Sequence, residues 1–349
     1  MINEHAGSNK FLKRIEKEIK NKKAEIDFNI LLPNAYYKKI LKKNKNKINL
    51  ARFDGVAFYK FTPENIINFI KLRYNKSLSN YLKKNFEIFI FTKIFNQYLN
   101  RYNQFMLNNC DGLVFQSNLS YKLHQRFLKL DNKKFKIILN GKSSSIDSSF
   151  NSIVSDNYPN LVITATFRPH KRLIDAIELT NHIKIKYPKV KLNIVGKIDK
   201  ITNENLKKID CNNCIFHGVK DQDYMDILYK NSHIGIATSY LDACPNSVVE
   251  MLSCGLPVIT TTASGAFELV NQAEDFSVFE KYDLDYFELE CYNKIPKINI
   301  NQWAAKIDNV MENYEYFRNF SKHIFEKNLN INLISQKYIN FAYELKATN

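Results

Sequence analysis

The chain has 349 residues, a formal net charge of +16 and 45% hydrophobic residues. This length exceeds what one compact core needs, so we expect two domains, and the hydrophobic content suffices for buried sheets. No apolar run reaches the roughly 18 residues of a membrane-spanning helix. The first twenty residues carry too many charges for a secretory signal, so none is expected.

The positive charge is concentrated in the first 150 residues. They hold 29 of the 51 Lys and Arg residues but only 11 of the 35 Asp and Glu residues, with the densest basic run at 36–47. Such a surface suits an anionic membrane, an acidic substrate or nucleic acid, or it is simply solvated. Because no nucleic-acid-binding motif accompanies the charge, no nucleic-acid partner is expected. The solvated surface and the membrane surface remain the leading alternatives.

The six cysteines are scattered, and only Cys211 and Cys214 form a Cys-x2-Cys pair. A zinc site of this type normally needs a second pair, so we expect no bound metal. Reduced thiols are the simpler interpretation and indicate a cytoplasmic protein.

The first half alternates strand and helix patterns. A cap at Ser8 or Asn9 followed by an apolar stripe predicts the first helix, and residues 63–106 are expected to be mostly helical. The Ser-rich stretch 143–149 is the expected linker. The predicted strands cover 28–32, 47–52, 112–116 and 135–140, and a further helix covers 117–127.

The second half repeats this alternation more clearly, which implies parallel sheets. The expected fold class is therefore α/β, with two doubly wound domains and ligands bound beyond the carboxyl ends of the strands. Residues 330–345 read as an amphipathic helix. The predicted strands cover 160–165, 190–195, 213–217, 234–237 and 258–262, and the predicted helices cover 173–186 and 224–231.

A basic loop follows the strand 160–165. It contains Arg168, His170, Lys171 and Arg172 within five positions. Arginine offers a bidentate fork and lysine a point charge, which together suit a diphosphate. A basic loop without a ligand is the alternative.

Two acidic residues, Asp242 and Glu250, lie eight positions apart. Pro245-Asn246 between them is expected to open a helix, and Gly255-Leu-Pro257 ends it before a strand. A helix N-terminus attracts phosphate, and carboxylates accept pairs of hydroxyl hydrogen bonds, as a nucleotide sugar requires. An ordinary helix–strand unit with two solvated acids is the alternative.

The segment Asp242-x7-Glu250 followed by Met-Leu-Ser-Cys-Gly-Leu-Pro-Val resembles the Glu-x7-Glu signature of the family 4 retaining glycosyltransferases, the glycosyl transferases group 1, which have the GT-B fold. Asp242 stands where the family usually has Glu. Arg168 and Lys171 resemble the phosphate clamp of the same family, and Arg172 stands where many relatives have glycine. The resemblance implies that Asp242, Glu250, Arg168 and Lys171 are the catalytic residues.

The resemblance also implies a donor site without a metal or cofactor, in which a UDP- or GDP-linked sugar is the substrate. Gly7, before the first helix, would allow close approach of phosphate. The implied donor-binding residues are Gly7, Arg168, Lys171, Gly196, Gly218, Val219, Asp242, Ala243, Cys244, Pro245, Asn246, Val249 and Glu250.

The acceptor site is expected in the basic first half. Arg52-Phe-Asp54-Gly55 resembles an Arg-Leu-Asp-Gly segment of some family members, so Arg52 and Asp54 are the expected acceptor-binding residues. A plain turn at Asp54-Gly55 is the alternative.

The expected domains are 1–150, basic and acceptor-binding, and 151–328, which binds the nucleotide sugar. Residues 329–349 are expected to pack back on the first domain, with packing inside the second domain as the alternative. The expected function is sugar transfer from a nucleotide-diphosphate sugar to a glycan or lipid-linked acceptor, with retention, in cell-surface polysaccharide or glycoconjugate synthesis. The expected location is the cytoplasm, with peripheral binding at the inner face of the membrane as an option. A GT-B epimerase or hydrolase and a non-catalytic basic binding module are the alternatives.

Overall fold

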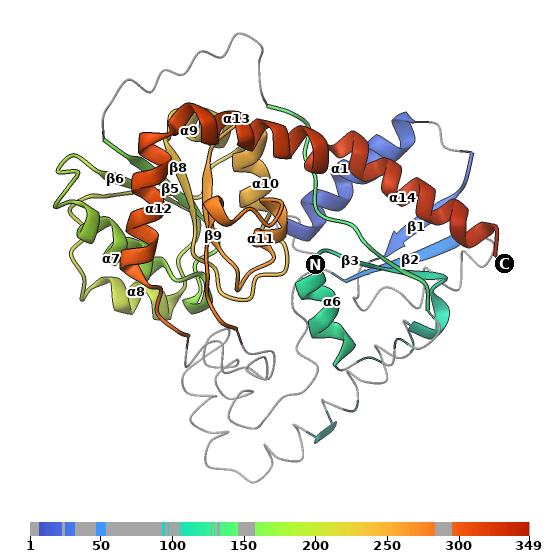
Figure 1. The fold of residues 1–349 in the computed structure, drawn as a ribbon. Coiled ribbons are helices and arrows are strands. Elements are labelled where there is room, and N and C mark those ends of the chain that lie inside the picture. The colour runs from blue at the N-terminus through green and yellow to red at the C-terminus, as the bar shows by residue number, and fades with distance from the viewer. Residues whose placement is uncertain are drawn as a thin grey trace.

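The computed structural model describes residues 7–22, 25–31, 47–53, 107–126, 133–145, 158–282 and 295–348, with positions 93, 94, 97, 105, 128 and 130. They form two lobes, each built on a parallel β-sheet (Figure 1). The predicted α/β class with two parallel sheets is confirmed. Most of the expected helical region 63–106 lies outside the described residues.

The sheet of the first lobe has four strands in the order β1-β2-β3-β4. Each neighbouring pair is parallel. Helix α6 (Asn118–Gln125) follows β3 directly, and the Ser117 hydroxyl caps it by accepting a hydrogen bond from the Ser120 N–H. The strands are β1 (Phe28–Leu31), β2 (Ile48–Phe53), β3 (Gly112–Phe115) and β4 (Phe135–Ile137).

Two helices from opposite ends of the chain pack together on the first sheet (Figure 1). They are α1 (Gly7–Asn21) and α14 (Ile331–Lys346). Buried Phe11 of α1 and Phe341 of α14 share one apolar cluster with strand residues. Gly112 permits the close approach of α14, because a Cβ there would stand only 2.6 Å from Leu345 Cδ1.

The second lobe has a six-stranded parallel sheet in the order β10-β9-β8-β5-β6-β7. The chain leaves β5 in one direction towards β6 and later returns on the other side through β8. The connections from β5 to β6 and from β8 to β9 therefore lead to opposite sides, and ligands bind at such a switch point. The strands are β5 (Asn160–Thr164), β6 (Lys191–Val195), β7 (Cys214–Gly218), β8 (Ile234–Ala237), β9 (Val258–Thr261) and β10 (Ser277–Val278).

Helices surround this sheet and complete a large apolar core that contains the fully buried Trp303. Asp199 and Asp221 cap the first turns of two of them. The helices are α7 (Leu173–Ile183), α8 (Lys200–Leu206), α9 (Gln222–Lys230), α10 (Asn246–Ser253), α11 (Ala266–Leu269), α12 (Ile300–Glu312) and α13 (Tyr314–Ile324), with 3-10 turns at Pro169–Lys171 and Glu274–Phe276.

Two passages of the chain meet at the junction between the lobes. The Lys142 N–H donates to the Leu329 carbonyl at 3.1 Å, and the Ile331 N–H donates to the Lys142 carbonyl at 3.0 Å. Leu329 ends a π-helical turn, Phe325–Leu329, that joins α13 to α14. The Lys142 ammonium also pairs with Asp226 of α9 at 2.7 Å.

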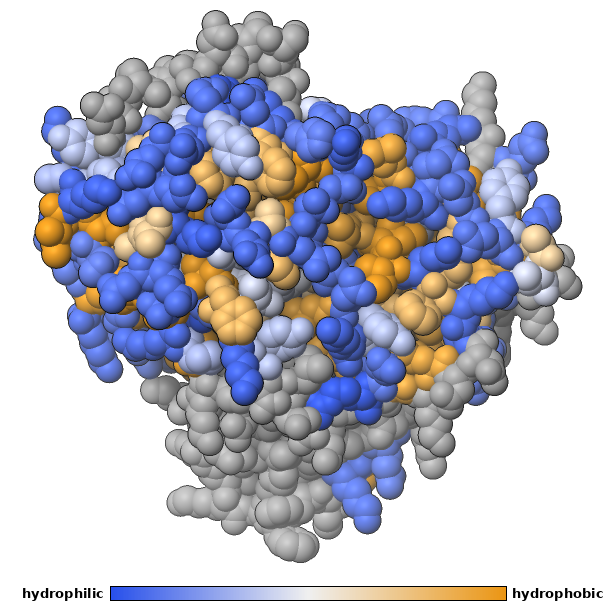
Figure 2. All heavy atoms as spheres, in the orientation of Figure 1, coloured by the Kyte–Doolittle hydropathy of each residue, from blue (hydrophilic) through white to orange (hydrophobic). Residues whose placement is uncertain are grey.

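The surface of the described part is largely polar on the face shown in Figure 2, where hydrophobic residues form small patches between charged ones. Among the described residues, no helix combines the length and the apolar character needed to cross a membrane.

Candidate active site

The predicted donor residues of the second lobe gather at the carboxyl edge of its sheet. Arg168 and Lys171 follow β5, Gly196 follows β6, Gly218 ends β7, and the acidic loop follows β8. Because parallel strands bring these ends to one edge, residues as far apart in sequence as Lys171 and Asp242, 71 positions, become neighbours.

Lys171 and Asp242 form an ion pair across this edge. Their side chains are 18% and 16% exposed. Burial alone would raise the pKa of Asp242, but the charge and hydrogen bond of Lys171 outweigh it and hold that pKa below its ordinary value. Burial, aided by the charge of Lys171, lowers the pKa of the adjacent His170 to about 3, so this imidazole is neutral at pH 7.

Arg168 opens the 3-10 turn Pro169–Lys171 with an extended backbone. It makes no ion pair with any residue in the described part of the chain.

Glu250 lies in α10 and contacts the first lobe. Arg14 of α1 pairs with the Glu250 carboxylate at 3.2 Å and also donates to Gln222 Oε1 at 3.3 Å. Gly7 is the first residue of this same helix α1. The N-terminal helix therefore reaches Glu250, an acid predicted from the sequence, through Arg14, which the sequence did not indicate.

Asn140 joins the first sheet to the start of α10. Its side-chain amide donates to the Asn246 side chain at 2.7 Å and to the Cys244 carbonyl at 3.2 Å. Asn246 is the first residue of α10, and Pro245 precedes it as the extended N-cap residue. The sequence contained the Asn140-Gly141 pair, but its contact with the acidic loop depends on how the lobes meet.

Arg52 is fully buried, which differs from the expectation that it contacts an acceptor. Its guanidinium donates to Asn140 Oδ1 and to the Tyr338 hydroxyl, and it lies 3.9 Å from the Phe11 ring centroid. Helices α1 and α14 cover this end of β2, so Arg52 supports Asn140 from beneath. Asp54 lies outside the described residues.

The remaining predicted donor residues differ in exposure. Ala243, Cys244 and Val249 are buried, so only their backbone groups could meet a ligand, whereas Val219 is 76% exposed. Gly196 and Gly218 both have left-handed φ values, 134° and 70°.

Glu268 of α11 forms a second contact between the lobes. Its carboxylate accepts from the Asn118 N–H at 2.8 Å, the Asn118 side chain at 2.9 Å and the Leu119 N–H at 3.0 Å. A carboxylate at a helix N-terminus satisfies free N–H groups and the helix dipole. Glu268 therefore caps α6 from the other lobe, a role with no signature in the local sequence.

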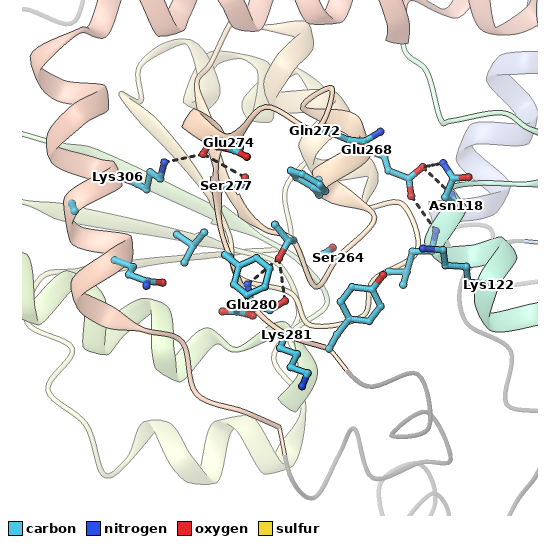
Figure 3. A pocket seen from close by; sticks show the side chains of 18 residues that line it. Asn118, Lys122, Ser264, Glu268, Gln272, Glu274, Ser277, Glu280, Lys281 and Lys306 are labelled. Carbon is cyan, nitrogen blue, oxygen red and sulfur yellow. Dashed lines mark hydrogen bonds between the residues drawn. The ribbon is translucent and has the colours of Figure 1, made fainter.

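A pocket of about 990 Å³ lies between α6 and the β9–β10 side of the second lobe. Lys122 and Glu268 lie on one side of this pocket, and Ser264 and Glu280 are also among the residues that line it (Figure 3). The pocket does not contain Lys171 or Glu250. It adjoins their site through Ser264, whose hydroxyl donates to the Asp242 carbonyl at 3.3 Å.

Among the described residues, no three His, Cys, Asp or Glu side chains are grouped so that they could hold a metal ion. Cys211 and Cys214 are unbridged thiols. Burial raises the pKa of both, to about 12 for Cys214, which makes them poor nucleophiles.

Two lobes that are each built on a parallel β-sheet form the GT-B architecture. The chain belongs to the family glycosyl transferases group 1, whose model matches residues 145–327. The prediction of an enzyme is thereby confirmed, and the non-catalytic binding module is set aside. A comparison with curated proteins finds no match in sequence.

Solved structures share this fold. Sucrose-phosphate synthase from Thermosynechococcus elongatus is 13% identical with a TM-score of 0.62, over 98% of this chain and 80% of that one. HepE from Anabaena, solved with UDP and glucose, is 14% identical with a TM-score of 0.58, over 95% and 81%. The pneumococcal O-GlcNAc transferase GtfA, solved with UDP and GlcNAc, is 13% identical with a TM-score of 0.61, over 95% and 60%.

Proposed function

We propose that this glycosyltransferase transfers a sugar from a nucleotide-diphosphate sugar, UDP- or GDP-linked, to a glycan or lipid-linked acceptor with retention. The enzyme would act in the synthesis of a cell-surface polysaccharide or glycoconjugate. The observation that carries the proposal is the Lys171–Asp242 ion pair, which joins the loop after β5 to the loop after β8 at the carboxyl edge of the second sheet.

The cations would stabilise the departing diphosphate. Negative charge develops on the leaving group as the sugar–phosphate bond breaks, and preorganised cations oppose it in a site of low dielectric. Arg168 has a guanidinium that no described carboxylate occupies, and Lys171 is held beside it by Asp242. The N-terminus of α10 adds its dipole from the same side.

The two acids would bind hydroxyl groups. Asp242 is ionised at neutral pH because Lys171 lowers its pKa against the effect of burial, so it accepts hydrogen bonds from the sugar. Glu250 would accept from the ribose hydroxyls. Arg14 forms an ion pair with the Glu250 carboxylate in this structure. When the ribose binds, Arg14 would share this carboxylate with it or move away.

The acceptor would enter through the pocket beside Ser264. Both lobes line it, and the Ser264–Asp242 hydrogen bond joins its wall to the sugar site. The partly buried ring of Phe267 and the amide of Gln272 suit a glycan, whose surface alternates apolar and hydroxyl faces.

Thermal stabilisation by nucleotides tests the donor class. We expect UDP or GDP, or one of their sugars, to raise the melting temperature by mass action, and Glu250→Ala to reduce this shift. Trp303, the single tryptophan, is fully buried in the second lobe and reports its unfolding by fluorescence. Glu204→Ala, at an exposed position of α8, is the matched control. No shift with any nucleotide diphosphate would contradict the donor site proposed here.

The basic first half would hold the enzyme at an anionic membrane surface on the cytoplasmic side. Its excess of Lys and Arg over Asp and Glu supports this, and the attraction is screened by salt. We expect co-sedimentation with phosphatidylserine vesicles at low ionic strength and release at high ionic strength. Equal recovery with neutral phosphatidylcholine vesicles would count against a membrane role.

A further inference from the structure

Each partner of the Lys171–Asp242 pair stands next to a residue with a left-handed backbone. Arg172 has φ 52° and Leu241 has φ 54°. Residues with a side chain seldom adopt this conformation, and such positions cluster at functional sites. Arg172 also links the 3-10 turn to α7, a place where glycine would fit without strain.

The Arg172 guanidinium explains why a large side chain is kept there. The residue is 3% exposed. It pairs with both carboxylate oxygens of Glu280, at 2.7 and 3.2 Å. It also donates to the Thr238 carbonyl at 2.6 Å and to the Pro296 carbonyl at 3.2 Å. Such a bidentate, charge-assisted arrangement fixes direction as well as position.

These contacts join the two segments that carry the ion pair. The Thr238 hydroxyl donates to the Lys171 carbonyl at 2.9 Å, and the Tyr240 N–H donates to the His170 carbonyl at 2.8 Å. The Arg172 guanidinium lies 5.3 Å from the Tyr240 ring centroid. The loop after β5 and the loop after β8 are therefore held together on both sides of Arg172.

We propose that Arg172 is a positioning residue that holds Lys171 and Asp242 in the geometry required for sugar transfer, with Glu280 as its anchor. This inference rests on the proposed function, because it assigns Arg172 an effect on that reaction. Glu280 also lines the pocket beside the site (Figure 3), so the same contact fixes one wall of that pocket.

The Arg172→Gly substitution distinguishes the effect of the backbone conformation from the effect of the guanidinium. Glycine accepts the left-handed conformation, so strain is removed while all four hydrogen bonds are lost. We expect the turnover number to fall about 100-fold, the cost of displacing reacting groups by about 1 Å, while the KM for the donor changes much less. Millimolar guanidinium chloride is expected to restore part of the turnover by filling the vacated space, whereas methylammonium chloride is not.

The controls distinguish positioning from general stability. Arg318→Ala removes another buried arginine of the second lobe, in α13, and should lower the melting temperature without lowering turnover. Glu280→Gln should reproduce the Arg172→Gly effect in weaker form.

Wild-type turnover in Arg172→Gly would overturn the positioning role. The role would also be overturned if guanidinium did not restore the lost turnover and if turnover fell in proportion to melting temperature in both Arg172→Gly and Arg318→Ala. If the wild-type enzyme itself transferred no sugar from any UDP- or GDP-sugar, the proposed function would fail before Arg172 was tested.

Discussion

Replacement of Lys171 by alanine is expected to lower the turnover number of sugar transfer by about 100- to 1,000-fold, the usual effect of removing one preorganised charge at a developing anion. Lys171 forms an ion pair with Asp242, and Arg172 at the end of the same turn is paired with Glu280, which leaves Arg168 as the second cation of this turn not paired with a described carboxylate. Turnover under saturating donor is the measurement. Lys191→Ala, exposed at the opposite end of β6, is the matched control.

The same replacement has a pH-dependent effect on stability. In the wild type, the pKa of Asp242 is lower in the folded state than in the unfolded state, so ionised Asp242 stabilises the fold. This stabilisation is fully present above the unfolded pKa and is lost as the pH falls through the folded pKa. Without Lys171, burial is the largest remaining influence and raises the pKa of Asp242, against smaller lowering effects of His170 and of a hydrogen bond from the Cys244 backbone. An ionised Asp242 then destabilises the fold at pH 7, and protonation relieves this at lower pH. The gap in melting temperature between variant and wild type should therefore narrow from pH 7 towards pH 4.

The double variant Lys171→Ala/Asp242→Asn separates the two effects. Removing the unpaired carboxylate should restore the melting temperature at pH 7 but leave turnover low. Wild-type turnover in Lys171→Ala would show that Lys171 does not act on the reaction.

Gly196→Ala is expected to destabilise the second lobe by about 2–6 kcal/mol. Gly196 has φ 134°, a region open almost only to glycine, and a Cβ there would lie 1.9 Å from the Ala165 carbonyl oxygen. That oxygen belongs to the backbone after β5, so relief would require the segment leading to Arg168 to move. Thermal unfolding followed by Trp303 fluorescence measures the loss.

Gly218→Ala is the matched control for this prediction. Gly218 also has positive φ, 70°, but a Cβ added there would have no atom of the described residues within 4 Å, apart from its own chain neighbours. Only the left-handed backbone is then penalised, at about 1–2 kcal/mol. Equal losses in the two variants would mean that the contact with Ala165 is not what makes glycine necessary at Gly196.

Local patterns predicted most of the second sheet. The strand predicted at 234–237 coincides with β8, because an apolar run between turn residues has few other solutions. Helix α8 gave no usable signal, since only Thr202 of its seven residues is buried. Helix α12 does have a local signal, because the buried residues Trp303, Ile307 and Val310 recur at helical spacing.

The contacts across the lobes could not be predicted in the same way. Arg14 and Glu250 are 236 positions apart, and a chain with 51 basic residues gives no reason to choose that pair. Arg52 was expected to bind the acceptor because nothing in its own segment indicates that α1 and α14 cover it. Such contacts follow from the placement of whole elements, which the local pattern does not encode.

The tie between Lys142 and its partners Leu329 and Ile331 has a mechanical consequence. Both connections between the lobes pass through one point and are joined there by backbone hydrogen bonds, so they act as a single pivot. Relative motion then reduces mainly to a swing about that pivot. Such a rotation would keep the hydrogen bonds of Lys142 while breaking the hydrogen bonds of Glu268 to α6 and the ion pair of Arg14 with Glu250. A bound donor that replaces these two contacts would then determine the angle between the lobes.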